Sequence, residues 1–170
     1  MADVKFKVKD LGKARIKREL KSTATHYALV GIPGGNVAGS SITLAEVALI
    51  LEKGSLQMRI PPRPFMKQTR EKASRGRFVK LMRAFYKKVV EGSQDAVQAL
   101  KDLGLAYEGE LKAIFTRGNF APNAPITING GWMRNRISGK PFKVKGKKSS
   151  RPLIDTGRLR QSITSKVVKV

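Results

Sequence analysis

The pattern of apolar positions predicts two long amphipathic helices in the middle of the chain. The first has Pro64 in its first turn, begins at Phe65, and keeps apolar residues at spacings of three and four as far as Val89. The second spans Ser93–Thr116, is expected to be capped by its first residue, and ends before Gly118. Its leucine, tyrosine and phenylalanine stripe is typical of a helix that packs against a core.

Four shorter elements are expected around these helices. Asp10–Ser22 is typical of a basic amphipathic helix, and His26–Ile32 of a short strand. Thr43–Lys53 fits both a helix and a buried strand; its strong helix formers favour a helix that ends at Gly54. The C-terminal residues Ile163–Val170 alternate in the manner of a strand, which could join a sheet within the subunit or across subunits.

The C-terminal third is expected to be irregular. Asn119–Gly131 is rich in proline, asparagine and glycine, and Met133–Arg151 has no periodicity and should be disordered in a lone subunit. Asp155 or Thr156 could cap a single helical turn that begins at Arg158. We therefore expect one α+β domain over residues 1–170, in which a small antiparallel sheet packs with the two long helices. Its core would cover about residues 10–118 and 152–170, and an extended basic loop about residues 119–151.

The charge of the chain changes this picture most. Its 35 lysines and arginines outnumber 12 acidic residues, which gives a formal net charge of +23 over 170 residues. An apolar content of 41% is too high for a wholly disordered chain. Such charge either covers solvated faces and one disordered loop or meets an acidic surface on nucleic acid or protein. The candidate basic loop has eight cations and no acid: Arg134, Arg136, Lys140, Lys143, Lys145, Lys147, Lys148 and Arg151.

The parts needed for catalysis are scarce. The chain has no cysteine and a single histidine, His26, in an apolar run, so we predict no metal site and no cofactor. No phosphate-binding glycine loop and no contrasting pair of carboxyl groups stands out. These observations predict a protein that is not an enzyme. No apolar run is long enough to cross a membrane, and no signal-peptide core is present, which predicts a soluble protein made in the cytoplasm.

Two motifs are more specific. Leu49–Gly54 ends in a hydrophobic-Glu-x-Gly pattern and is followed by Ile-Pro-Pro-Arg-Pro-Phe over Ile60–Phe65; Pro152–Ile163 reads Pro-Leu-Ile-Asp-Thr-Gly-Arg-Leu-Arg-Gln-Ser-Ile. In order and spacing these motifs resemble the two signatures of tailed-bacteriophage neck and tail-completion proteins. The connecting segment Asn123–Ile128 is also similar, whereas Asn129–Trp132 departs from the lysine- and glycine-rich turn of many relatives. The resemblance covers about residues 40–170.

This resemblance implies a structural virion protein without catalytic residues. It implies a homo-oligomeric ring of six or twelve copies at the head–tail junction or the head-proximal end of the tail. The partners implied are other neck, connector and tail proteins, with DNA as a possible contact in the lumen and no membrane. The positions expected to support assembly are Glu52, Gly54, Pro62, Arg63, Pro64, Phe65, Asp155, Thr156, Gly157, Leu159 and Ile163.

Two alternatives stay open at this point. Phe65 could anchor the chain's own core, which we favour, or a neighbouring subunit. Composition alone would also suit a basic nucleic-acid-binding protein of ribosomal type. An aromatic content of only 6% and the absence of a recognised RNA-binding motif count against that second function.

Overall fold

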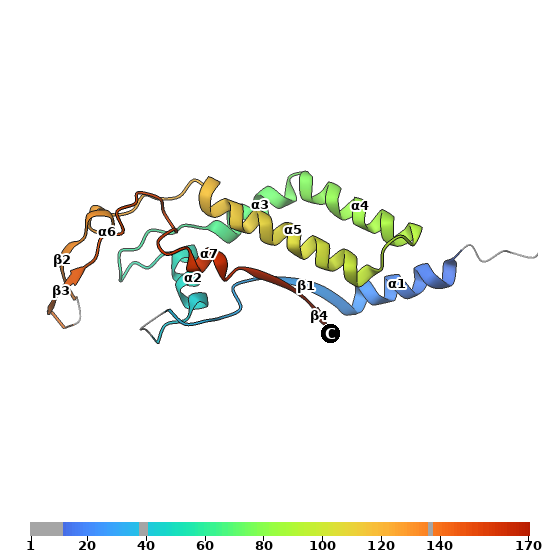
Figure 1. Cartoon of the computed structure of the whole chain (residues 1–170), viewed down its shortest axis with the longest axis horizontal. Helices are drawn as coiled ribbons and strands as arrows, with labels where there is room; N and C mark the ends of the chain where they lie inside the picture. The colour runs from blue at the N-terminus through green and yellow to red at the C-terminus, as the bar shows by residue number, and fades with distance from the viewer. Residues whose placement is uncertain (1–11, 38–40, 136–137) are drawn as a thin grey trace, which may run out of the picture.

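The computed structural model describes residues 12–37, 41–135 and 138–170. Within these residues the chain is α+β, as expected, with seven helices and two two-stranded antiparallel sheets. The molecule is elongated (Figure 1). Helix α1 (Lys13–Thr25) lies at one end, and the hairpin of β2 (Gly131–Arg134) and β3 (Pro141–Val144) lies at the other.

Helix α5 (Ala96–Arg117) is the central element. Strands β1 (His26–Gly31) and β4 (Thr164–Lys169) pack along one side of it, and helices α3 (Phe65–Ser74) and α4 (Arg77–Glu91) along the other (Figure 1). Every layer of the fold therefore depends on α5, which matches the long second helix expected from the sequence.

The sheet pairs the N-terminal and C-terminal parts of the chain. Strands β1 and β4 are antiparallel, with Ala28 opposite Val167 and Val30 opposite Ser165. Gly104 lets α5 approach this sheet closely, because a Cβ atom there would lie 3.3 Å from the Cβ atom of Ser165. The C-terminal strand thus joins a sheet within the subunit, which is the first of the two pairings considered for it from the sequence.

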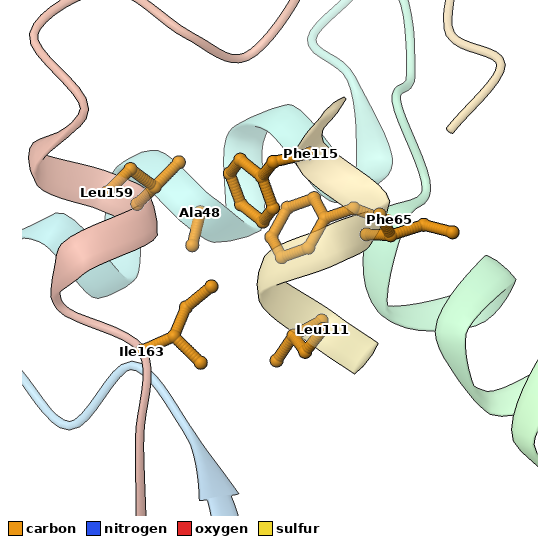
Figure 2. Close-up of a cluster of buried hydrophobic side chains, with 7 residues drawn as sticks. Ala48, Phe65, Leu111, Phe115, Leu159 and Ile163 are labelled. Carbon is orange, nitrogen blue, oxygen red and sulfur yellow. The ribbon is translucent and has the colours of Figure 1, made fainter. Parts of the chain in front are cut away.

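One cluster of buried side chains joins both ends of the sequence. Phe65 and Phe115 pack with their rings tilted at 55° and their centroids 4.9 Å apart, and Ile163 packs into the same cluster from the C-terminal segment (Figure 2). Its buried members are Ala48, Phe65, Leu111, Ile114, Phe115, Leu159 and Ile163. A smaller cluster of Val89, Ala96 and Ala99 closes the other end of the α4–α5 pair.

Local signals explain where several helices begin. Helix α2 (Leu44–Lys53) starts in a capping box in which Thr43 and Glu46 bond each other's backbone N–H groups, and it ends at Gly54 as expected. Helix α1 continues three residues beyond the predicted end at Ser22; Asp10, its expected cap, lies outside the described residues.

The predicted cap of α5 was wrong. Asp95 is the N-cap residue, and its carboxylate accepts a hydrogen bond from the Gln98 N–H over 2.8 Å. The Ser93 hydroxyl instead donates to the Lys88 carbonyl oxygen at the end of α4. The Asp95 carboxylate also interacts favourably with the positive end of the helix dipole.

The first of the two long helices is in fact two shorter ones. Helix α3 ends at Ser74 and α4 begins at Arg77, because Gly76 has φ +125°, a conformation that a helix cannot contain. The break allows each half to make its own aromatic contact with α5. Phe78 of α4 meets Tyr107 edge to face at 5.5 Å, while α3 supplies Phe65.

The C-terminal third is more regular than predicted. Helix α6 (Pro125–Asn129), with proline at its first position, interrupts the expected loop, and β2 and β3 form a hairpin inside the expected disordered segment. These strands are four residues long, too short for an alternation that stands out in the sequence. Helix α7 (Arg158–Gln161) follows Gly157, its N-cap residue, while the Thr156 hydroxyl accepts a hydrogen bond from the Arg158 N–H in the first turn, as predicted for Asp155 or Thr156.

Candidate functional site

The first motif forms a tight corner, which we call the proline corner (residues 54–65). Gly54 has φ +76°, and a Cβ atom at this position would lie 2.8 Å from both the Ile60 carbonyl oxygen and the Pro62 nitrogen. Ser55 and Ile60 exchange two backbone hydrogen bonds of 2.9 Å, which closes the loop between them. Only glycine fits at the base of this loop, which explains the Glu-x-Gly part of the motif.

Glu52 fastens the proline corner to the next helix. Its two carboxylate oxygens accept hydrogen bonds from the N–H groups of Met66 and Lys67 over 2.9 and 3.0 Å. These groups belong to the first turn of α3, where Pro64, the N-cap residue, offers no side-chain cap. The carboxylate satisfies two free donors and lies at the positive end of the helix dipole.

Arg63 is the buried polar centre of the corner. Its side chain is 7% exposed, and its guanidinium donates to the carbonyl oxygens of Ala121 and Pro122 and to the Asn123 side chain over 2.9 to 3.2 Å. Burial lowers the pKa of Arg63 from its usual value. The three neutral acceptors hold the segment that follows α5 against the proline corner.

The same network reaches the base of the hairpin. The amide of Asn123 donates to the carbonyl oxygens of Ser150 and Arg151, each over 3.1 Å. The Lys147 ammonium donates to the Ile154 carbonyl oxygen at 2.8 Å. Burial lowers the pKa of Lys147, and the Asp155 carboxylate partly offsets this effect. Arg63 and Lys147 therefore hold separate segments of the chain together through hydrogen bonds to backbone carbonyl oxygens.

The second motif completes the corner from the opposite side. Gly157, at φ +77°, turns the chain into α7, and the Arg158 N–H donates to the Thr156 hydroxyl at 3.4 Å. Leu159 and Ile163 point into the main core, as expected, whereas Arg158 and Arg160 are exposed. Asp155 and Thr156 are exposed as well.

An open cavity of about 370 Å³ lies where these parts meet. Leu51 and Leu159 supply apolar wall, while Arg63, Lys147 and Asp155 supply charged groups at its margin. We call this region the signature joint (the proline corner, residues 121–123, residues 147–163 and the cavity between them). It brings both sequence motifs to one place, and its hydrogen bonds and packed side chains hold these segments in a fixed arrangement.

Four predicted assembly residues are buried inside this chain. Phe65 is fully buried, and Arg63, Leu159 and Ile163 are 7%, 8% and 1% exposed. Their side chains pack against the chain itself, so any support that they give to assembly acts through the shape of the subunit. They shape the joint from within, and Phe65 belongs to the chain's own core.

The eight predicted basic-loop residues do not form one group. Arg134, Lys140 and Lys143 are exposed on the hairpin or its turn. Lys145, Lys148 and Arg151 lie on the segment that returns to the core, and Arg136 is outside the described residues. Lys147 differs from the others, because its ammonium donates to the backbone carbonyl oxygens of Arg151 and Ile154.

Sequence reasoning missed two features. Glu108 bonds both the Lys112 ammonium at 2.6 Å and the Ser165 hydroxyl at 2.8 Å, which ties α5 to β4. The i,i+4 spacing to Lys112 was visible in the sequence, but the contact with the strand was not. The tip of the proline corner exposes Leu56 almost completely, at 99%, and Met58 at 61%.

Other kinds of site are not apparent in the part of the chain that the structure describes. No three histidine or acidic side chains there could hold a metal ion. Over the same residues, no helix is long and apolar enough for a bilayer. Comparison of the chain with protein-family models, curated proteins and solved structures finds no match.

Proposed function

We propose that the chain is a structural protein of a tailed-bacteriophage virion, a neck or tail-completion protein. It assembles as a ring of six or twelve copies at the head–tail junction, where it joins or completes the tail. It has no catalytic role. The proposal starts from the resemblance of two motifs to the signatures of that group, and the following observations support it.

The observation that carries the proposal is the signature joint. Phe65 of the first motif and Ile163 of the second are almost a hundred residues apart in sequence, yet they pack in one core cluster. The two motifs therefore form one structural unit. We expect this if both motifs serve the same assembly role. Gly54 and the prolines beside it limit the conformations of this unit, so little order would be lost on docking.

The tip of the proline corner is the contact surface that we propose for neighbouring copies. Leu56 and Met58 project from a loop whose base is closed by hydrogen bonds between Ser55 and Ile60. A rigid, exposed apolar tip gains free energy when a neighbour buries it. Strands β1 and β4 form a sheet of only two strands, so each also offers an unpaired edge in the described structure.

The charge of the chain points to acidic neighbours in the particle. Copies with a formal charge of +23 repel one another, and a ring of them needs compensation. Connector and tail proteins with acidic surfaces, or DNA in the lumen, would supply it. Ring formation should therefore strengthen as salt screens the repulsion between copies.

The contact is tested with a pair of matched variants. Leu56→Asp places a charge on the tip, and Leu105→Asp places the same charge on α5, where the leucine is 60% exposed. We expect sedimentation velocity to show a ring for the wild type and for Leu105→Asp, and smaller species for Leu56→Asp. If all three proteins sediment equally as rings, the tip is not part of the interface between copies.

The second candidate is a basic nucleic-acid-binding protein of ribosomal type. It is favoured by the exposed cations Arg134, Lys140 and Lys143 of the hairpin, an element that lies at the opposite end of the molecule from α1 (Figure 1). A protein that stays monomeric and binds structured RNA tightly at physiological salt would support it over the virion role.

A further inference from the structure

The β2–β3 hairpin stands apart from the rest of the molecule. It lies at the end of the elongated fold, beyond α6 and away from the β1–β4 sheet and helix α4 (Figure 1). Its side chains Trp132, Met133 and Phe142 are 70%, 42% and 45% exposed. Large apolar side chains at this exposure, on an element that contributes nothing to the core, call for a partner.

The partner must be negatively charged. Between Glu110 and Asp155 the sequence contains no acidic residue, and the hairpin lies inside this stretch. Arg134, Lys140 and Lys143 are exposed, so no carboxylate of the surrounding segment neutralises them. Their field attracts an anionic chain from a distance of about 10 Å at moderate salt.

The strand register places an aromatic ring beside two of these cations, Arg134 and Lys143. Trp132 is opposite Lys143, and Arg134 is opposite Pro141. Because side chains alternate between the faces of a strand, Trp132, Arg134 and Lys143 share one face of the ribbon. Met133 and Phe142, which also pair across the strands, lie on the other face.

The base of the hairpin is fixed before any partner binds. Gly146 packs so closely on the end of α6 that a Cβ atom there would lie 2.5 Å from the Gly130 nitrogen. The N–H groups of Lys147 and Lys148 donate to the carbonyl oxygens of Thr127 and Ile128 over 3.1 and 3.0 Å. The ribbon thus presents its charged face in a set direction, which lowers the entropy lost on binding.

We propose that the β2–β3 hairpin is a binding arm for single-stranded nucleic acid. Arg134, Lys140 and Lys143 hold backbone phosphates, and the Trp132 indole stacks on an unpaired base. An acidic protein segment would use the same cations but offers an aromatic ring only where it carries an aromatic residue, whereas every nucleotide carries a base that can stack on Trp132. The inference is independent of ring assembly, because the arm belongs to each single chain.

Trp132 is the only tryptophan of the chain, so its fluorescence reports on the arm directly. The full-length protein is titrated with an oligothymidylate of about 16 nucleotides, the upper end of common single-strand site sizes. A duplex of the same length and a polyglutamate of similar charge serve as the other two probes. We expect saturable quenching by the single strand, weaker quenching by the duplex, and none by polyglutamate.

Two charge variants separate the arm from the general charge of the protein. The arm variant carries Arg134→Ala, Lys140→Ala and Lys143→Ala, and the control carries Arg83→Ala, Lys17→Ala and Lys80→Ala at exposed helix positions. Both lose three positive charges. We expect the arm variant alone to lose about 100-fold in single-strand affinity at 0.1 M salt, with a salt slope less steep by about 2.

Removing the Trp132 indole tests the proposed stacking on a base. Trp132→Ala leaves the core untouched and should weaken single-strand binding by about tenfold or more, read for this variant and the wild type by the anisotropy of a dye-labelled oligothymidylate. Retained circular dichroism and an unchanged melting temperature would confirm that each variant is folded. Absent quenching, equal losses in the two charge variants, or saturable binding to polyglutamate alone would each overturn the proposal, and none of these outcomes bears on whether the chain forms a ring.

Discussion

At the scale of single residues, Gly54 is a position where no side chain fits. In Gly54→Ala the new methyl group would meet backbone atoms at 2.8 Å, at a φ of +76° that strains any other residue. We expect a loss of about 2–4 kcal/mol in the free energy of unfolding, measured by urea denaturation.

Gly109→Ala is the matched control for this change. Gly109 lies inside helix α5, and a Cβ atom there would have nothing within 4 Å. The substitution should leave stability unchanged or raise it by up to about 1 kcal/mol, because alanine favours the helix. Equal stability of the two variants would contradict the constraint that we assign to the proline corner.

Glu108 gives the stability of the fold a dependence on pH. Its hydrogen bond with Lys112 is the main cause that lowers the pKa of this carboxyl below its usual 4.5, and the bond from Ser165 adds to it. A lowered pKa means that the folded state gains stability above the ordinary pKa and loses it as pH falls through the folded-state value. We expect Glu108→Gln to cost about 1 kcal/mol at neutral pH and to flatten the acid side of the stability profile.

The control for Glu108 is Glu71→Gln, which removes an exposed i,i+4 ion pair with Lys67 at 3.9 Å. Exposed pairs of this kind contribute little. Thermal melts between pH 3 and 7 should therefore distinguish Glu108→Gln from the wild type and leave Glu71→Gln close to it. Parallel profiles for all three proteins would show that the α5–β4 contact carries no pH-dependent stability.

At the scale of elements, the start of α3 depends on a residue of α2. Glu52→Ala removes the carboxylate that accepts from the N–H groups of Met66 and Lys67. We expect a loss of about 1 kcal/mol in stability and faster hydrogen exchange in the first turn of α3, read by NMR or mass spectrometry. Unchanged exchange there would mean that the helix start does not need this contact.

The elements that sequence analysis predicted best were those with a long apolar period. The apolar stripe over Ser93–Thr116 predicted nearly all of α5, and Gly54 correctly predicted the end of α2. The break between α3 and α4 was missed because an apolar stripe runs on through Gly76, and only its φ of +125° shows that the chain turns there. The hairpin was missed because four-residue strands carry too few positions to reveal a period.

The candidate site was predicted in its residues but not in its contacts. Gly54, Phe65, Leu159 and Ile163 were singled out, and all of them lie in or beside the signature joint. Sequence alone could not show that Arg63 would be buried against carbonyl oxygens after α5, since that pairing depends on the tertiary fold. For the same reason the sequence could not show which of the expected assembly positions are buried in the chain's own core, and the exposed tip at Leu56 was overlooked.

At the scale of the whole molecule, the fold separates its proposed tasks. The signature joint and α5 hold the chain together, the proline-corner tip projects apolar side chains, and the hairpin carries cations at the far end (Figure 1). The net charge of +23 opposes contact between copies unless salt or an acidic partner screens it. A protein built in this way should be most ordered, and most strongly associated, when its neighbours are present.

The most direct test of the proposed assembly is the native mass of the purified chain at physiological and at higher salt. A ring predicts a species of six or twelve times the 18.7 kDa chain, more populated as salt rises or when phage tails are added. A single 18.7 kDa species under all of these conditions would contradict the proposed function.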